Sequence, residues 1–206
     1  MPQPWPSHPI PLRLGVMASG SGSNFEALVE ATRQQRLQAS VELLVVNHEQ
    51  CGARSRAERL AIPWRWIDHR AFPSREDLDD ALIGAFRDAG VDLVVMAGWM
   101  RIVTPRLIEA FPDRLLNIHP SLLPSFRGLD AVGQALAAGV CITGCTVHLV
   151  RPEVDAGPIL AQAAVPVHSG DDAPTLAARI HTQEHRILPL AVALAAQRLA
   201  GLPPQG

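Results

Sequence analysis

The chain has 206 residues, of which 48% are hydrophobic, and a formal net charge of -2. That apolar content is enough for a sizeable core, so it predicts a folded protein of one large or two small domains and excludes a disordered chain. The near-neutral charge argues against a non-specific nucleic-acid or membrane-surface binder, which would normally carry a basic face.

The lysine and cysteine content further limits the classes of reaction that the protein could catalyse. All 18 basic residues are arginine, which excludes reactions that need a lysine, such as Schiff-base formation, pyridoxal-phosphate catalysis and a Walker A phosphate loop. Cys51, Cys141 and Cys145 form no CxxC pair, and we expect them to be free, buried thiols. An odd count without paired spacing favours a reducing cytoplasm.

The two ends of the chain are predicted to lie outside the folded unit. Residues 1–11 contain five prolines and no long apolar segment. They therefore predict a flexible arm, and neither a signal peptide nor a membrane span. A single domain is expected over residues 12–200, followed by a short tail at 201–206.

Strands and helices are predicted to alternate in the first half of the chain. The apolar run at 12–18 ends at small polar residues and is typical of a buried parallel strand. A helix is expected at 24–37, because Phe25, Leu28 and Val29 recur on one face. The other expected strands are 41–46, 62–68, 91–97 and 114–118, and the other expected helices are 52–60, 74–90 and 104–111.

Capping signals support the helix at 74–90. Ser74 and Asp77 resemble a capping box, in which a hydroxyl and a carboxylate satisfy the first backbone N–H groups. Gly90 is expected to end the helix, since glycine readily takes the left-handed conformation found just beyond a helix.

The second half is predicted to contain a helix at 130–138, strands at 141–150 and 159–167, and a long helix at 174–199. Pro189 lies inside the last helix, where it removes a backbone hydrogen bond, so we expect a kink or a split there. The alternation of elements favours an α/β protein built on one doubly wound, mostly parallel sheet.

The predicted fold also indicates where a ligand would bind. In such sheets, ligands lie outside the carboxyl ends of the strands. We therefore expect one cleft to bring together three segments: the loop after the strand at 12–18, the loop after the strand at 91–97, and residues 117–128.

The first of these loops is SGSGSN, residues 19–24. Its glycines permit a tight turn, and the free N–H groups at a helix start bind anions. A dinucleotide site would need a third glycine where Phe25 stands and an acidic residue where the second strand ends in Asn47 and His48. NAD is therefore not expected, and the loop is either a site for a terminal phosphate or a plain connecting turn.

Asn117 and His119 lie on either side of an isoleucine where a buried strand is predicted to end. Their spacing puts both side chains on one face of an extended segment. An amide N–H and a protonated imidazole are two donors that can stabilise a developing oxyanion. The alternative is a core histidine and a turn asparagine in front of Pro120.

Asp155 lies in the short loop 151–158 between two predicted strands. A carboxylate beside His119 would favour the imidazolium form and could help to carry a proton. The alternative is that Asp155 only caps a turn. His148, in the middle of a strand, is interpreted as a supporting structural residue. The histidines lack the spacing of metal ligands, so no metal is expected.

Four segments, NIHPSLLPSFRG (117–128), GCTVHLVRPEVDAGPIL (144–160), SGSGSN (19–24) and MAGWMRIV (96–103), together resemble the glycinamide ribonucleotide formyltransferases of purine biosynthesis. The resemblance extends over about residues 12–200. It implies a formyltransferase fold with a Rossmann-like N-terminal half, and transfer of a formyl group from 10-formyltetrahydrofolate to glycinamide ribonucleotide. We expect a cytoplasmic monomer or homodimer with small-molecule substrates, no nucleic-acid partner and no membrane.

The resemblance also implies roles for individual residues. Asn117, His119 and Asp155 match the catalytic residues of the family. The residues implied in binding the amine substrate are Gly22, Ser23 and Asn24 for its phosphate, and Glu184 for its ribose hydroxyls. The residues implied in binding the folate are Arg75, Met100, Arg101, Ile102, Val103, Asn117, Val150 and Val154.

The sequence departs from the family pattern at a few positions. His181 stands where a glutamine or lysine is common, Trp99 where phenylalanine is usual, and His48 where a lysine is common. Two other functions are considered: a formyltetrahydrofolate hydrolase-like enzyme, and a catalytically silent folate- or nucleotide-binding module. All three implied catalytic residues are present, which favours an enzyme over the silent module. The stretch HPSLLPS (119–125) favours transfer, because the resemblance implies that the hydrolase differs at the residue after its histidine.

Overall fold

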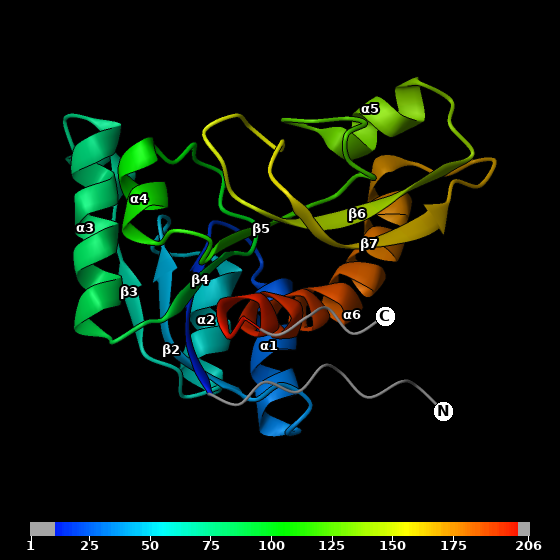
Figure 1. Cartoon of the computed structure of the whole chain (residues 1–206). Helices are drawn as coiled ribbons and strands as arrows, with labels where there is room; N and C mark the ends of the chain where they lie inside the picture. Colours follow the sequence, from blue (N-terminus) through cyan, green and yellow to red (C-terminus); the bar gives the residue numbers. More distant parts are fainter. Residues whose placement is uncertain (1–10, 202–206) are drawn as a thin grey trace.

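A computed structural model of the protein describes residues 11–201. The arm predicted at 1–11 and the tail predicted at 201–206 lie, except for one residue each, outside the described residues. The described chain forms one seven-stranded sheet in the order β3-β2-β1-β4-β5-β6-β7, with helices on both faces (Figure 1). The strands are β1 Leu12–Ala18, β2 Ala39–Val46, β3 Trp64–Trp66, β4 Leu93–Met96, β5 Leu115–His119, β6 Ile142–Leu149 and β7 Ile159–Pro166.

The helices follow the predicted order. They are α1 Ser23–Arg33, α2 Gly52–Arg59, the short 3-10 helix η1 His69–Ala71, α3 Arg75–Asp88, α4 Pro105–Ala110, α5 Ala131–Ala137 and α6 Ala173–Leu199. The expected capping of α3 is present, because the Ser74 hydroxyl accepts a hydrogen bond from the Asp77 backbone N–H at 3.1 Å. Gly90, just beyond α3, has the left-handed φ of 66° that was expected of it.

The sheet is mostly parallel, as predicted. Strands β1 to β5 pair in parallel, whereas β6 pairs antiparallel with both β5 and β7. A parallel strand buried on both sides has apolar residues at consecutive positions, and the burial of β4, where all four residues are buried, fits this rule. The chain is therefore an α/β protein whose parallel half is followed by an antiparallel pair.

Alternate residues of each central strand enter two separate cores. Val16, Leu44 and Val95 pack on the face covered by α1, α2 and α6. Their neighbours Met17 and Val45 pack on the opposite face with α3 and α4. Successive side chains of a strand point to opposite faces, so unbroken apolar runs are what a sheet covered on both sides requires.

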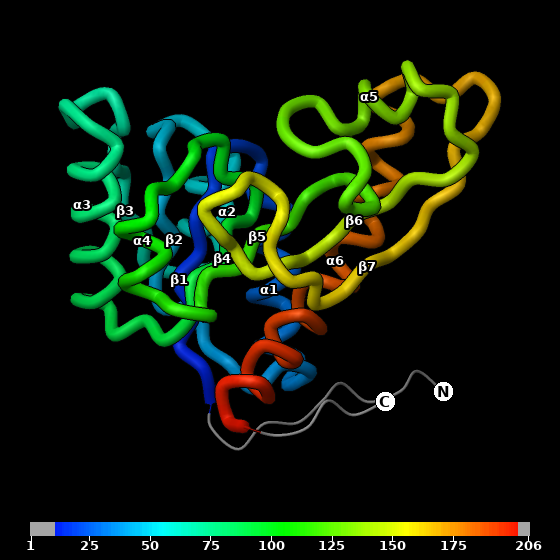
Figure 2. Tube along the Cα trace, turned by 45° about the horizontal axis from the view of Figure 1, so that its top comes forward, coloured from blue at the N-terminus to red at the C-terminus, as the bar shows by residue number. Residues whose placement is uncertain are grey.

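The order of the strands changes direction at β1 and β4, which pair directly with each other. The chain moves outward from β1 to β2 and β3, and then crosses back to place β4 on the other side of β1. The loops after β1 and β4 are joined there: the Ser19 N–H donates to the Gly98 carbonyl at 3.0 Å, and the Met100 N–H donates to the Ser19 hydroxyl at 2.9 Å. Figure 2 shows the loop between β6 and β7 close to this end of the sheet.

Two local predictions were wrong, and a third was confirmed in part. Helix α1 ends at Arg33 and not near residue 37, because Gln35 adopts a left-handed φ of 57° and Leu37 turns into the core. Of the kink or split expected at Pro189, the split does not occur, since α6 is assigned as one helix through it; the ribbon changes direction along its length (Figure 1). Cys141 is exposed, while Cys51 and Cys145 are buried, and all three thiols are free.

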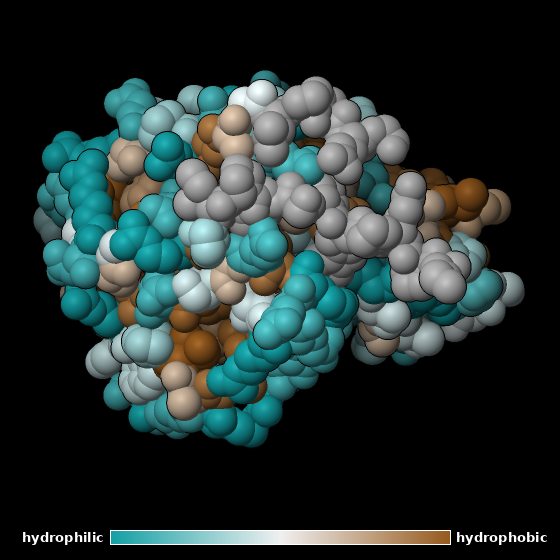
Figure 3. Space-filling model, turned by 60° about the horizontal axis from the view of Figure 1, so that its bottom comes forward, coloured by the Kyte–Doolittle hydropathy of each residue, from teal (hydrophilic) through white to brown (hydrophobic). Residues whose placement is uncertain are grey.

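The described surface is predominantly polar on the side that Figure 3 turns forward, where hydrophilic residues surround smaller hydrophobic areas. No helix among residues 11–201 combines the length and the apolar character needed to cross a membrane. The longest one, α6, carries Glu184 and several arginines.

Candidate active site

A cavity of about 940 Å³ lies at the carboxyl ends of β1, β4 and β5, where the fold predicted a cleft. All the site residues predicted from the sequence line it, except Gly22 and Ser23. The lining also includes His69, Asp130 and His181, which were not among the predicted site residues. Segments that lie far apart in the chain thus meet around one space.

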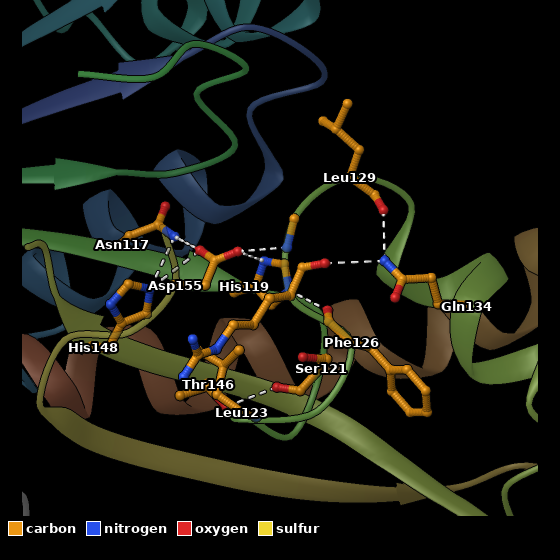
Figure 4. Close-up of polar contacts among 12 residues, drawn as sticks. Asn117, His119, Ser121, Leu123, Phe126, Leu129, Gln134, Thr146, His148 and Asp155 are labelled. Carbon is orange, nitrogen blue, oxygen red and sulfur yellow. Dashed lines mark hydrogen bonds and ion pairs between the residues drawn. The ribbon is translucent and has the colours of Figure 1, made fainter. Parts of the chain in front are cut away.

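Asp155 is the centre of the polar wall of this cavity (Figure 4). Its Oδ2 accepts a hydrogen bond from the Gly128 backbone N–H at 2.8 Å and lies 3.4 Å from His119 Nδ1. Its Oδ1 lies 3.4 Å from Asn117 Nδ2 and 3.6 Å from His148 Nε2. The backbone of Asp155 has a φ of 52°, a left-handed conformation that Asp and Asn tolerate better than most residues.

His119 is buried with an acceptor beside each ring nitrogen. Nε2 lies 2.9 Å from the Phe126 carbonyl oxygen, and because a carbonyl only accepts, that nitrogen carries a proton. Nδ1 faces the Asp155 carboxylate. A doubly protonated ring would direct one N–H at each of these oxygens, so the surroundings of His119 match an imidazolium.

Asn117 is held by the neighbouring strand. His148, its register partner on β6, places Nδ1 2.9 Å from the Leu149 carbonyl and must donate to it. Its Nε2 lies 3.1 Å from Asn117 Nδ2 and 3.6 Å from Asp155 Oδ1. The opposite amide orientation would turn the Asn117 oxygen toward the carboxylate of Asp155, so these contacts fix which way the amide points.

The electrostatics of the wall favour an ionised Asp155. Burial of the carboxyl opposes ionisation and by itself raises the pKa. The His148 ring, the Gly128 N–H and the nearby His119 favour the charged form more strongly, so the pKa of Asp155 is lowered overall. Asp155 is therefore a carboxylate throughout the neutral pH range.

A second polar corner of the cavity lies at the start of α1. Gly22 precedes that helix with a φ of 77°, and a Cβ at this position would come within 2.5 Å of the Ala53 backbone. Glycine is therefore required, and it leaves the helix start without a side-chain cap. Asn24 Nδ2 donates to Glu184 Oε2 at 2.8 Å, which joins α1 to α6 across 160 residues of sequence.

Glu184 is almost fully buried, with 3% of its surface exposed. Oε2 accepts hydrogen bonds from Asn24 and from His181 Nδ1, the latter also at 2.8 Å. Within residues 11–201 no group donates a hydrogen bond to Oε1 of Glu184, and this oxygen is not fully buried. It can therefore accept a hydrogen bond from a bound molecule.

The remaining part of the cavity is largely apolar with a basic rim. Met100, Ile102 and Val154 expose about half or more of their surface there. Arg101 contacts the ring of His69, and Arg75 begins α3 at the same rim. Within the described chain, no group of three or more His, Cys, Asp or Glu side chains is arranged to hold a metal ion.

The chain is similar to known proteins over most of its length. The formyl transferase family model matches residues 12–192. The phosphoribosylglycinamide formyltransferase of Bacillus subtilis is 39% identical over 94% of this chain and 97% of its own length. A glycinamide ribonucleotide transformylase of Symbiobacterium toebii, of known structure, has a TM-score of 0.89 and 45% identity over 91% of this chain and 89% of its own.

A longer human protein also contains a matching region. The trifunctional purine biosynthetic protein adenosine-3 of Homo sapiens is 42% identical over 89% of this chain. The present chain spans only 18% of that protein's length, and similarly small shares of its counterparts in other animals.

Proposed function

The chain belongs to the formyl transferase family, and from that premise we propose that it transfers the formyl group of 10-formyltetrahydrofolate to the primary amine of glycinamide ribonucleotide, a reaction of purine biosynthesis. The observation that carries the proposal is the meeting of an amide, an imidazole and a carboxylate at one wall of a cavity large enough for both substrates.

The proposed reaction is an acyl transfer without a covalent enzyme intermediate. The amine nitrogen attacks the formyl carbon, and the carbonyl electron pair moves onto oxygen to give a tetrahedral oxyanion. The amine loses a proton, the carbon–nitrogen bond to the folate breaks, and the folate nitrogen takes up a proton. The enzyme therefore needs donors for the oxyanion and a route for one proton.

Asn117, His119 and Asp155 are the groups we propose for these tasks. Asn117 and His119 stabilise the oxyanion, while Asp155 holds the imidazolium in place and accepts the amine proton directly or through water. In the structure the Nε2–H of His119 is donated to the neutral Phe126 carbonyl. An oxyanion is a stronger acceptor than a carbonyl, so it competes effectively for that proton donor.

We propose that glycinamide ribonucleotide occupies the corner formed by α1 and α6. Its phosphate would meet the N–H groups at the start of α1, around Gly22, Ser23 and Asn24. The free Oε1 of Glu184 is suited to accept hydrogen bonds from the ribose hydroxyls. This arrangement would direct the amine of the substrate toward Asn117 and Asp155.

We propose that the folate occupies the apolar part of the cavity. Met100, Ile102, Val103, Val150 and Val154 offer surface for its rings. The guanidinium groups of Arg75 and Arg101 lie at the rim, where the carboxylates of a folate tail could pair with them.

The alternative functions differ in what they require. A hydrolase would release formate without any amine, and a silent binding module would release nothing. The test follows the absorbance of the deformylated folate with and without glycinamide ribonucleotide. Transfer predicts turnover only when the amine is present; turnover without the amine, or none at all, contradicts the proposal.

We propose that the protein is located in the cytoplasm and that it is a monomer or a homodimer. The three free thiols agree with a reducing compartment. Sedimentation of the full chain over a range of concentrations would distinguish the two assemblies and would reveal any larger one.

A further inference from the structure

We propose that Asp79 is a positioning residue for the folate. Through its hydrogen bonds to Thr104 it fixes the end of the 98–103 loop, and with it the wall of the cavity that the folate contacts. This inference rests on the proposed function, which places the folate against that loop, and extends it. Neither Asp79 nor Thr104 lines the cavity, so their effect on the folate passes through the loop.

Asp79 is a buried carboxyl that the proposed reaction does not use. It lies on α3 with 1% of its surface exposed, beside Leu78 and Leu82, which pack in the core on that face of the sheet. Burial raises the pKa of Asp79 above its ordinary value, and hydrogen-bond donors of Thr104 and Leu107 oppose this rise. Acidic side chains are rarely this buried without partners, so these donors indicate why a carboxyl stands here.

Thr104 is the principal partner of this carboxyl. Its backbone N–H and its hydroxyl donate to the same oxygen, Oδ2 of Asp79, at 2.7 and 2.8 Å. Thr104 is also the N-cap of α4, where its hydroxyl oxygen accepts from the Arg106 N–H at 3.2 Å. Asp79 on α3 therefore holds the start of another helix, and it restrains both the backbone and the side chain of the residue that directly follows the loop.

The 98–103 loop has few other restraints. Met100 and Ile102 leave 66% and 55% of their surface exposed, so burial does little to hold them. Near the beginning of the loop, the Met100 N–H donates to the Ser19 hydroxyl at 2.9 Å. Within the described chain, the backbone groups of residues 101–103 form no hydrogen bond. The contact with α3 is therefore the second of two anchors, and the residues that line the cavity lie between them.

Helix α3 is suited to this task because it also carries a residue of the opposite rim. Arg75 lies one turn before Asp79 on the same helix and lines the cavity. The distance between the guanidinium rim and the loop is thus set by one packed element. A loop that is already ordered loses less conformational freedom when a ligand binds, so this anchor is expected to strengthen binding of the folate.

The test uses the full chain and compares Asp79→Asn, Thr104→Val and Thr104→Ser with the wild type. The first change removes the charge and turns an amide N–H2 toward one of the donors, the second removes only the hydroxyl, and the third keeps it. The matched control is Asp80→Asn, the next residue on α3, whose carboxylate pairs with Arg106 at the surface. We would measure kcat, KM for each substrate, and hydrogen–deuterium exchange of residues 98–104.

We expect Asp79→Asn to raise KM for 10-formyltetrahydrofolate about tenfold and Thr104→Val to raise it about threefold, because the loop must then be ordered on binding. KM for glycinamide ribonucleotide and kcat should change by less than about twofold. Thr104→Ser and Asp80→Asn should match the wild type. Exchange of residues 98–104 should become faster in the first two variants, while that of β1 and β5 stays unchanged.

Two results would overturn the inference: an unchanged KM for the folate in Thr104→Val and in a folded Asp79→Asn, or an equal rise in KM for both substrates, which would indicate a general loss of structure. If Asp79→Asn does not fold, the comparison of valine with serine at position 104 decides in the same way. A wild-type chain that transfers no formyl group would instead contradict the proposed function. Exchange of residues 98–104 does not depend on turnover, so the two failures are distinguishable.

Discussion

The sharpest test of the proposed mechanism is Asp155→Asn. The change removes one negative charge while keeping nearly the same shape, and asparagine tolerates the left-handed φ of 52° at this position. A carboxylate and an imidazolium 3.4 Å apart attract each other by about 5 kcal/mol at an effective dielectric constant of 20. Only the part of this attraction that is stronger in the transition state than in the bound substrate complex affects kcat.

We therefore expect kcat to fall by about 10² to 10³, the effect of losing roughly 2.7–4 kcal/mol of transition-state stabilisation. The assay follows the deformylated folate at saturating concentrations of both substrates. Both KM values should change little, and the free energy of unfolding should fall by only about 1 kcal/mol, since the new amide oxygen can still accept from Gly128.

The matched control is Glu153→Gln in the same loop. Glu153 is 73% exposed and pairs with Arg127, so its loss should leave turnover near the wild-type rate. If Asp155→Asn also retains near wild-type turnover, the carboxylate has no part in the chemistry and the reasoning from its position is refuted.

Three further changes test other parts of the molecule. Asn24→Ala removes a donor from buried Glu184 and should raise KM for the amine substrate about tenfold; an unchanged KM would contradict the assigned corner. Arg101→Ala should raise KM for the folate by roughly threefold to tenfold and leave the amine substrate unaffected, which steady-state kinetics with each substrate varied would show. The pKa of Asp171 is lowered to about 2, chiefly by its hydrogen bond with Arg179, so its contribution to stability is present above the unfolded value of 3.8 and is lost as pH falls toward 2. Asp171→Asn should therefore reduce the decline of the urea midpoint on acidification below about pH 4, and an equally steep decline would rule out this pair as a cause.

Much of the fold could be predicted because the signals are local. The apolar runs identified the central strands, and the spacing of Phe25, Leu28 and Val29 identified the inner face of α1. Ser74 marked the start of α3 because a hydroxyl at that position satisfies an N–H only three residues away. Such patterns follow from the period of a helix or a strand, so they involve only residues that are close in the sequence.

The exact ends and internal geometry of elements were predicted less well. Helix α1 stops at Arg33 because a left-handed Gln35 allows Leu37 to pack into the core, which outweighs the helical preference of the residues between. Pro189 is accommodated inside α6, where neighbouring residues are buried against the sheet. At the end of α1, tertiary packing thus decided against a purely local preference.

The residue types of the candidate site could be predicted from the sequence, but the contacts between these residues could not. The residue types that could carry the chemistry were visible in Asn117, His119 and Asp155. Only the folded chain brings His148 against Asn117, Phe126 against His119 and Asn24 against Glu184. Sequence alone therefore determined the elements and the chemical groups available, because both depend on near neighbours. The tertiary structure decided which groups meet, because strand order, register and single backbone angles bring together residues as far as 160 positions apart.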